Sequence, residues 1–170
     1  MIHHIANFQG GTVGLATSAS YATTATNLVN PFIAAGASGL STIINNGAGS
    51  NYATATVIDP TTSGYTILER SITKSSTGFT PTQTGYYQIT FNIGARDTGG
   101  ANTLFYFMIG VNGAAYTVRA QSIVSNFESI QTLNTVASVS AGQLIDFRIG
   151  TTGGDSITFG NFDVIISKVG

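Results

Sequence analysis

The chain has 170 residues, no cysteine and only 8% charged residues, against roughly a quarter in an average globular protein. The missing cysteines exclude a disulfide framework or thiolate metal site, and a formal net charge of -1 with scattered Lys and Arg argues against nucleic-acid binding. So few charges protect a surface poorly against association. We expect part of the surface to be buried between subunits; the alternative is a surface solvated by Ser, Thr, Asn and Gly.

The charged residues divide the chain, because no Asp, Glu, Lys or Arg precedes Asp59. We therefore predict a charge-free N-terminal arm and linker over residues 1–51 and a head domain over residues 52–170. The first residues, MIHHIANFQGG, lack the basic start and apolar core of a secretory signal. The apolar stretch 28–44 is interrupted by Asn, Pro and Gly, so we expect no membrane span.

Within the arm, Ala or Leu recurs every third residue from Ala16 to Leu28, a period that matches neither a helix nor a strand. Three interpretations remain open: a short helix that ends at Pro31, an extended segment wound with two copies of itself, or a polar tether. Similar Ala, Thr and Asn tracts occur in phage fibre shafts, which the segment resembles. We expect its apolar side chains to anchor the chain to a capsid or tail protein: Ile2, Ile5, Phe8, Leu15 and Leu28. His3 and His4 could meet a metal on a three-fold axis, but two solvated histidines are the simpler interpretation.

From Tyr52 onward the sequence predicts only strands, separated by clusters of Gly, Pro, Asn, Asp and Ser. The predicted strands cover residues 52–58, 65–72, 86–95, 103–111, 115–123, 128–139, 143–150 and 157–169. Short, closely spaced strands without helical patterns between them are typical of an all-β antiparallel sandwich of the jelly-roll type.

Alternation along two of these strands predicts which faces are buried. The strand after Gly85 has one apolar side, whereas the strand from Thr103 is apolar on both sides, so one of its faces needs a partner outside the sandwich. We expect that partner to be a second copy of the chain; the alternative is a covering loop from residues 31–51. The predicted subunit interface is Leu104, Tyr106, Met108 and Tyr86, and the predicted core is Tyr87, Ile89, Phe91, Phe105, Phe107, Ile109, Phe147 and Phe162.

Four segments of the head resemble the complement globular-head family. The run GFTPTQTGYYQITF has the Phe, the Pro and the Gly-x-Tyr of that family's entry to its large strand, at Phe79, Pro81, Gly85 and Tyr87. The segments MIGVNG, VASVSAGQLIDFRI and ITFGNFDVII follow in the family's order. The resemblance implies the jelly roll that this family shares with tumour necrosis factor, and a homotrimeric head on the end of a trimeric stalk.

The sequence also departs from that family. Gln143 stands where the family has Asp, and Asn161 stands where it has Gly. Asp97 and Asp155 lie in or beside Gly-rich turns, but isolated turn aspartates usually bond backbone amides, whereas calcium needs several oxygen ligands close together. We therefore expect no metal and no cofactor.

Catalysis is not expected, because the head contains no histidine and its carboxylates are spread singly along the strands. Two functions remain. The first is a homotrimeric bacteriophage capsid fibre, decoration or spike protein in the virion, anchored by its arm, with a head that faces outward and could bind a host-surface glycan or protein. The second is a cellular or secreted trimeric head at the cell surface that binds a receptor or a glycan.

Overall fold

The structure is a computed structural model, and it describes residues 31–37, 42–44, 46–61, 66–97, 103–123, 129–152 and 156–169. All the regular elements in these ranges are β-strands, and the predicted all-β antiparallel class is confirmed. In the same ranges, no helix is long and apolar enough to cross a membrane.

The strands form two sheets, which we call sheet A and sheet B. Across sheet A the order is β10 (Ser129–Val139), β7 (Gly85–Asp97), β12 (Ile157–Lys168), β1 (Phe32–Ala37) and β4 (Thr66–Arg70), with the short β2 (Thr42–Ile44) also paired to β12. Across sheet B the order is β5 (Ile72–Ser75), β6 (Gly78–Pro81), β11 (Ile145–Thr151), β8 (Thr103–Val111) and β9 (Ala114–Ile123), with β3 (Thr56–Val57) paired to β11.

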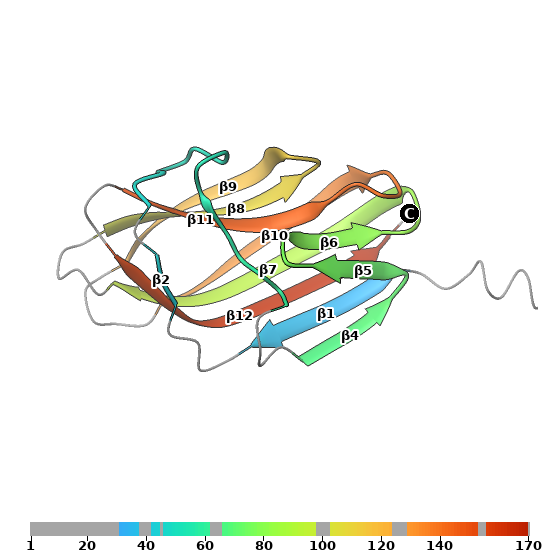
Figure 1. Cartoon of the computed structure of the whole chain (residues 1–170), viewed down its shortest axis with the longest axis horizontal. Helices are drawn as coiled ribbons and strands as arrows, with labels where there is room; N and C mark the ends of the chain where they lie inside the picture. The colour runs from blue at the N-terminus through green and yellow to red at the C-terminus, as the bar shows by residue number, and fades with distance from the viewer. Residues whose placement is uncertain are drawn as a thin grey trace, which may run out of the picture. The chain divides into compact units, whose positions relative to one another are not determined.

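The path of the chain between the sheets makes the sandwich a jelly roll. From β6 onward the chain passes from sheet B to β7 in sheet A, returns for the β8–β9 hairpin, and then crosses at β10, β11 and β12. Figure 1 shows the long strands of both sheets running along the long axis of the picture. The β8–β9 hairpin turns at Asn112 and Gly113, whose φ values of 52° and 79° are those of the tight turn that Asn-Gly favours.

The core lies between the sheets and is built from alternate residues of the strands. Along β7, the odd-numbered residues from Tyr87 to Asp97 are all fully buried, while Tyr86 and Gln88 on the other side are exposed. Aromatic rings join the two layers: Phe147 of β11 lies 5.0 Å from Phe91 of β7 and 6.1 Å from Phe162 of β12, measured between ring centroids. Tilted and edge-on packing of this kind adds to the stabilisation from apolar burial.

The residues predicted as core all lie in this layer. Each of them is at most 1% exposed and belongs to the main buried cluster: Tyr87, Ile89, Phe91, Phe105, Phe107, Ile109, Phe147 and Phe162.

Six of the predicted strands correspond to β7–β12, and the differences lie in the first half of the chain. The predicted strand 65–72 is two strands, because Ser71 has a left-handed φ of 53° where the chain turns from β4 to β5. The predicted strand 52–58 is a strand only at Thr56–Val57. The strands β1, β2 and β6 were not predicted.

The predicted division between residues 51 and 52 is wrong, because β1 and β2 belong to sheet A. β1 pairs with β12 on one side and with β4 on the other, and β2 pairs with β12. Backbone contacts divide the chain between Asn30 and Pro31 instead. The absence of charge therefore did not mark the end of a separate segment: residues such as Ile33 and Ala35 are uncharged because they are buried in the core.

Phe147→Ala tests the role of the aromatic cluster. We expect the substitution to lower the free energy of unfolding by about 3–5 kcal/mol, because it removes a buried ring that touches three others. Denaturant unfolding followed by circular dichroism measures the change, and Thr73→Ala on the exposed side of β5 is the control. A loss below about 1 kcal/mol would contradict the assignment of Phe147 to the centre of the core.

Candidate functional site

The outer side of sheet B is crossed by residues 46–58, which we call the strap. The strap contains β3, whose residues Thr56 and Val57 pair with Ile149 and Arg148 of β11. Its backbone is also bonded at both ends, from Gly49 N to Thr151 O at 2.9 Å and from Ile58 N to Phe147 O at 2.9 Å. In Figure 1 this segment lies across β11.

Asn46 fixes the start of the strap with its side-chain amide. The Nδ2 group donates to Ile149 O at 2.8 Å and to Thr56 Oγ1 at 2.9 Å. The Oδ1 atom accepts from Thr151 N and from Ala48 N, both at 3.0 Å. One hydrogen and the oxygen of this amide thus join the strap to β11, and its other hydrogen bonds Thr56 within the strap.

Tyr52, Asp146 and Arg148 form a polar cluster under the middle of the strap. The Tyr52 hydroxyl donates to Asp146 Oδ1, and Arg148 Nε and Nη2 each lie 2.8 Å from Asp146 Oδ2. Arg148 Nη1 donates to Tyr52 O at 2.9 Å, and its guanidinium carbon lies 3.9 Å from the centre of the Tyr52 ring. A buried carboxylate is stable when it is paired and hydrogen-bonded in this way.

Glycine makes room for this cluster on β8. A Cβ atom added to Gly110 would collide with Asp146 Oδ1 and with the Tyr52 hydroxyl. Because Asp146 and Arg148 bond to each other and to Tyr52, we interpret the cluster as a clamp that holds the strap on sheet B.

The strap covers part of the face that the sequence assigned to a subunit interface. Met108 is fully buried, in one cluster with Tyr52 and Ala55 of the strap. Tyr106 packs against the same cluster and is half-buried, as is Leu104. The prediction that Met108 lies in a subunit interface is therefore wrong, because a loop of the same chain, starting near the end of residues 31–51, takes its place.

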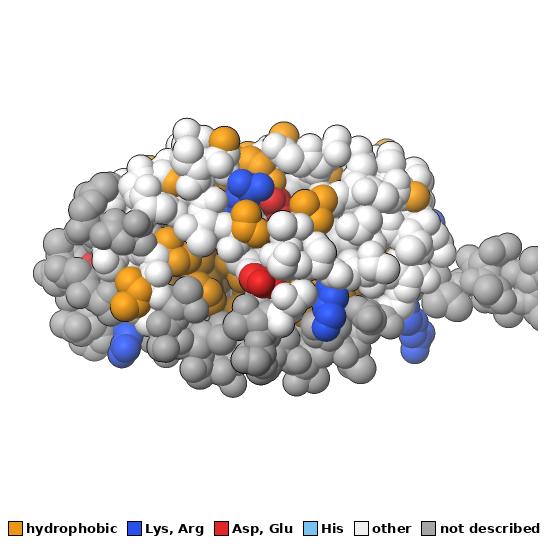
Figure 2. All heavy atoms as spheres, viewed as in Figure 1, with side chains coloured by type: hydrophobic (Ala, Val, Ile, Leu, Met, Phe, Trp, Pro, Cys, Tyr) orange, Lys and Arg blue, Asp and Glu red, His pale blue; other side chains and the backbone are white. Residues whose placement is uncertain are grey.

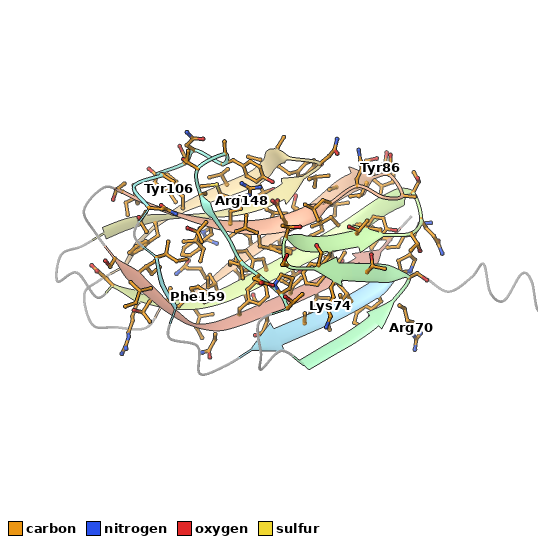
Figure 3. All side chains as sticks on the ribbon, viewed as in Figure 1. Arg70, Lys74, Tyr86, Tyr106, Arg148 and Phe159 are labelled. Atoms are coloured by element: carbon orange, nitrogen blue, oxygen red, sulfur yellow. The ribbon has the colours of Figure 1, made fainter. Side chains whose placement is uncertain are left out.

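The fourth predicted interface residue, Tyr86, lies on the other sheet. It belongs to β7 and is 58% exposed, on the outer side of sheet A. Figure 3 shows Tyr86 and Tyr106 near opposite ends of the sandwich. The four predicted interface residues therefore do not form one surface.

The outer face of sheet A carries most of the exposed large apolar side chains in the described ranges. We define this face by the outward-pointing residues of β2, β7, β10 and β12 and of the residue after β12. Six of the eight such side chains lie on it: Ile43, Tyr86, Ile130, Val136, Ile165 and Val169. The other two, Tyr116 and Val118, belong to β9 of sheet B.

Uncharged polar side chains lie between these apolar residues. Thr132 of β10 donates to Asn92 of β7 at 2.7 Å, and Thr90 lies 3.5 Å from Asn134 one row further along. Figure 2, which views the molecule from the side of the strap, shows that charged side chains are few on that side as well. A face of this composition is easily desolvated, because it contains few groups whose hydration is costly to remove.

The free edge of β10 is closed by two side chains from β9. The Tyr116 hydroxyl donates to Val136 O at 3.1 Å, and Arg119 Nη1 donates to Thr132 O at 2.9 Å. An open strand edge would otherwise present unpaired carbonyl groups to any other strand. Among the described residues, the outer face of sheet A is therefore more open to a partner than this edge.

The remaining sequence candidates are either buried or outside the described residues. Asp97 is fully buried at the end of β7, away from solvent. Asp155, His3, His4 and the proposed anchor residues Ile2, Ile5, Phe8, Leu15 and Leu28 lie outside the described residues. In the described ranges, no group of three or more His, Asp or Glu side chains is placed to hold a metal ion.

Sequence reasoning missed both the strap clamp and the outer face of sheet A. Tyr52 and Asp146 are 94 residues apart in the chain, so no local pattern links them. The face did leave a signal, because Ile130 and Val136 occupy the outward positions of β10 among polar residues. Apolar residues at outward positions of an otherwise alternating strand were the sequence signal for an apolar outer side of sheet A.

The clamp predicts a specific response to alkaline pH. Burial, followed by the hydrogen bond to Asp146, raises the pKa of Tyr52 above its usual value near 10. The neutral form of Tyr52 is thus favoured in the folded state. The amount by which this raises the free energy of unfolding is complete below the unfolded-state pKa, and it is lost as the pH rises from the unfolded-state pKa toward the folded-state pKa. Tyr52→Phe should therefore reduce the fall in unfolding free energy between pH 9 and pH 11, measured by denaturant titration. Tyr86→Phe, at an exposed position, is the control, and equal pH profiles for wild type and Tyr52→Phe would contradict the expectation.

Comparisons with known proteins agree with this architecture. No protein-family model matches the sequence, and neither does any curated protein. Among solved structures, the Eiger tumour necrosis factor of S. frugiperda is similar at 16% identity and a TM-score of 0.55, over 82% of this chain and 94% of that one. PRD1 vertex protein P5 is similar at 16% identity and a TM-score of 0.56, over 82% of this chain and 97% of that one. The chain therefore has the jelly-roll fold that tumour necrosis factor-like proteins and this vertex protein share.

Proposed function

We propose that the protein is a non-enzymatic structural protein of a bacteriophage virion, a homotrimeric capsid fibre, decoration or spike protein. Its N-terminal arm attaches to a capsid or tail protein, and its jelly-roll head faces outward, where it could meet a host-surface glycan or protein. The observation that carries the proposal is the concentration of exposed apolar side chains on the outer face of sheet A.

Self-association through this face is supported by the difference between the two sheets. On sheet B, the strap already covers Met108, whereas on sheet A the side chains of Ile130 and Val136 are 72% and 52% exposed. The exposed apolar side chains of sheet A are separated only by uncharged polar residues, so the face can be desolvated as a whole. A second and a third copy of the same chain would cover this face in a closed assembly.

Assignment to a virion is supported by the second solved structure and by the composition of the arm. That structure is a phage vertex protein with the same fold. The arm, residues 1–30, contains no charged residue and several large apolar ones, which suits a segment that is buried against another protein.

The alternative is a secreted or cell-surface trimeric head that binds a receptor or a glycan. The observation that favours it is the equal likeness to Eiger, a tumour necrosis factor. Fractionation separates the two functions, since the protein should be found in purified particles in the first case and in the medium or at the cell surface in the second.

A matched pair of substitutions tests the face. Ile165 on sheet A and Val118 on sheet B are 44% and 43% exposed, so they differ mainly in the sheet that they belong to. Ile165→Glu should dissociate the trimer, because a charge buried without a partner costs several kcal/mol, whereas Val118→Glu should leave it intact. Sedimentation velocity at micromolar concentration measures both. The reverse result would assign the interface to sheet B, and a 17.5 kDa monomer for the wild type would contradict self-association.

Removal of residues 1–30 tests the role of the arm. Because the sandwich lies in Pro31–Gly170, the shortened chain should fold and form trimers but should no longer be incorporated into particles. Immunogold electron microscopy of virions produced with full-length or shortened protein gives the comparison. Equal labelling of both particles would contradict anchoring by the arm.

A further inference from the structure

The exposed apolar side chains of sheet A are spread unevenly along its outer face. We call the part of this face beside residues 86–90 of β7 the near half and the part beside residues 92–96 the far half. Among the described residues, four of the six exposed large apolar side chains of the face lie in the near half: Tyr86, Val136, Ile165 and Val169. The other two, Ile130 and Ile43, lie in the far half.

Charged side chains have the opposite distribution on the strands that form the middle of the face. On β7, β10, β12 and the residue after β12, the outward residues of the near half are all apolar or uncharged polar: Tyr86, Gln88, Thr90, Asn134, Val136, Ser138, Ile165, Ser167 and Val169. The far half contains two exposed charges, Asp163 of β12 and Arg96 of β7. Burial of a charge in an interface is costly even when the charge is paired. Contact between copies is therefore more favourable over the near half.

Arg70 lies level with the near half but at the edge of the sheet. It is opposite Phe32 of β1, which is in turn opposite Ser167 of β12. Because neighbouring strands are about 4.8 Å apart, the backbone of Arg70 is roughly 10 Å from β12. Figure 3 shows the Arg70 side chain pointing away from the sandwich. Arg70 can therefore stay in water at the rim of a contact that covers β7, β10 and β12.

The chain enters the sandwich at the near half. Lys168 N donates to Pro31 O at 3.0 Å, and Val169 N donates to Tyr86 O at 2.8 Å. In Figure 1 the start of β1 and the end of β12 lie at the same end of the sandwich. The three arms of the proposed trimer lead to one attachment site. An arrangement with the near halves close to the three-fold axis brings together the points from which these arms start.

A three-fold assembly requires two different parts of the surface to meet, because a contact between identical patches relates only two copies. The near half has two such parts. On one side are Val136 of β10 and Tyr86 of β7, in neighbouring rows, and on the other side are Ile165 of β12 and Val169. The β10 side of one copy can therefore meet the β12 side of the next, and a third contact of the same kind closes the ring.

We propose that three copies meet over the near half of sheet A, with the β10 side of each against the β12 side of the next, and that they diverge toward the far half. Asp163 and Arg96 then stay in water, and the three far halves surround a hydrated opening on the axis. The inference rests on the proposed self-association and adds which part of the face makes the contact.

Two charge substitutions on one strand test the position of the contact. Val136 and Ile130 both point outward from β10, and Ile130 is the more exposed, at 72% against 52%. If exposure alone decided the effect, Ile130→Glu would be the more damaging change. We expect Val136→Glu to weaken the trimer by about tenfold or more in its dissociation constant, and Ile130→Glu to change it by less than about threefold, because only the first charge is buried. Sedimentation velocity over a concentration series measures both variants, and circular dichroism verifies that each is folded.

The divergence of the copies can be measured separately with spin labels. The chain contains no cysteine, so Ser138→Cys and Ile130→Cys each introduce one labelling site per copy, at exposed outward positions of β10. Double electron–electron resonance should give a shorter distance between copies for the label at position 138 than for the label at position 130. Equal distances, or a shorter distance at position 130, would overturn the divergence.

The outcomes separate this inference from the proposed function. If Val136→Glu and Ile130→Glu dissociate a trimeric wild type to the same extent, or if Ile130→Glu is the more damaging, the assignment to the near half is wrong while self-association through sheet A stands. If neither variant weakens a trimeric wild type, both the near half and the choice of sheet A are wrong. If the wild type itself is monomeric over the whole series, the proposed self-association fails, and this inference fails with it.

Discussion

Four phenylalanine rings join the two layers of this sandwich, and most of the other features depend on that contact. Phe79 and Phe147 come from sheet B, Phe91 and Phe162 from sheet A, and the rings meet at centroid distances between 5.0 and 6.1 Å. With the inner faces held together in this way, the strands have only their outer faces left for other roles. Each outer position is then either covered by another segment or exposed to water.

The two outer faces differ in how they are covered. On sheet B the chain itself returns over β11 and β8, and it uses a buried ion pair and two side-chain amide contacts to stay there. On sheet A, the described residues leave six large apolar side chains exposed, and Tyr116 and Arg119 close the β10 edge. This difference between the two faces is the basis of our proposal that the protein associates through sheet A.

The sequence predicted the second half of the fold well because its strands alternate strongly. The alternation in β7 separates Tyr87, Ile89 and Phe91 from Tyr86 and Gln88, and the buried residues follow that pattern. The first half was predicted poorly, because β1 is made of small residues such as Ala34, Ala35 and Gly36 that show no clear periodicity.

The surfaces were harder to predict than the core, for a different reason. The apolar outer side of β8 was recognised, but whether a loop or a subunit covers it depends on contacts such as Tyr52 with Asp146, which join residues 94 positions apart. Contacts between residues so far apart in the chain produce no local sequence pattern from which they could be predicted. The residues of sheet A that we assign to association are distributed over four strands, so their common face becomes visible only once the register is known.

The position of β1 has a mechanical consequence. β1 is bonded along its length to β12 on one side and to β4 on the other, and antiparallel hydrogen bonds run perpendicular to the strands. A pull on Pro31 directed along β1 therefore loads both ladders in shear, so that many hydrogen bonds must break together rather than one after another. The first strand of the sandwich therefore resists a pull applied along it far better than a strand whose hydrogen bonds could be opened one at a time.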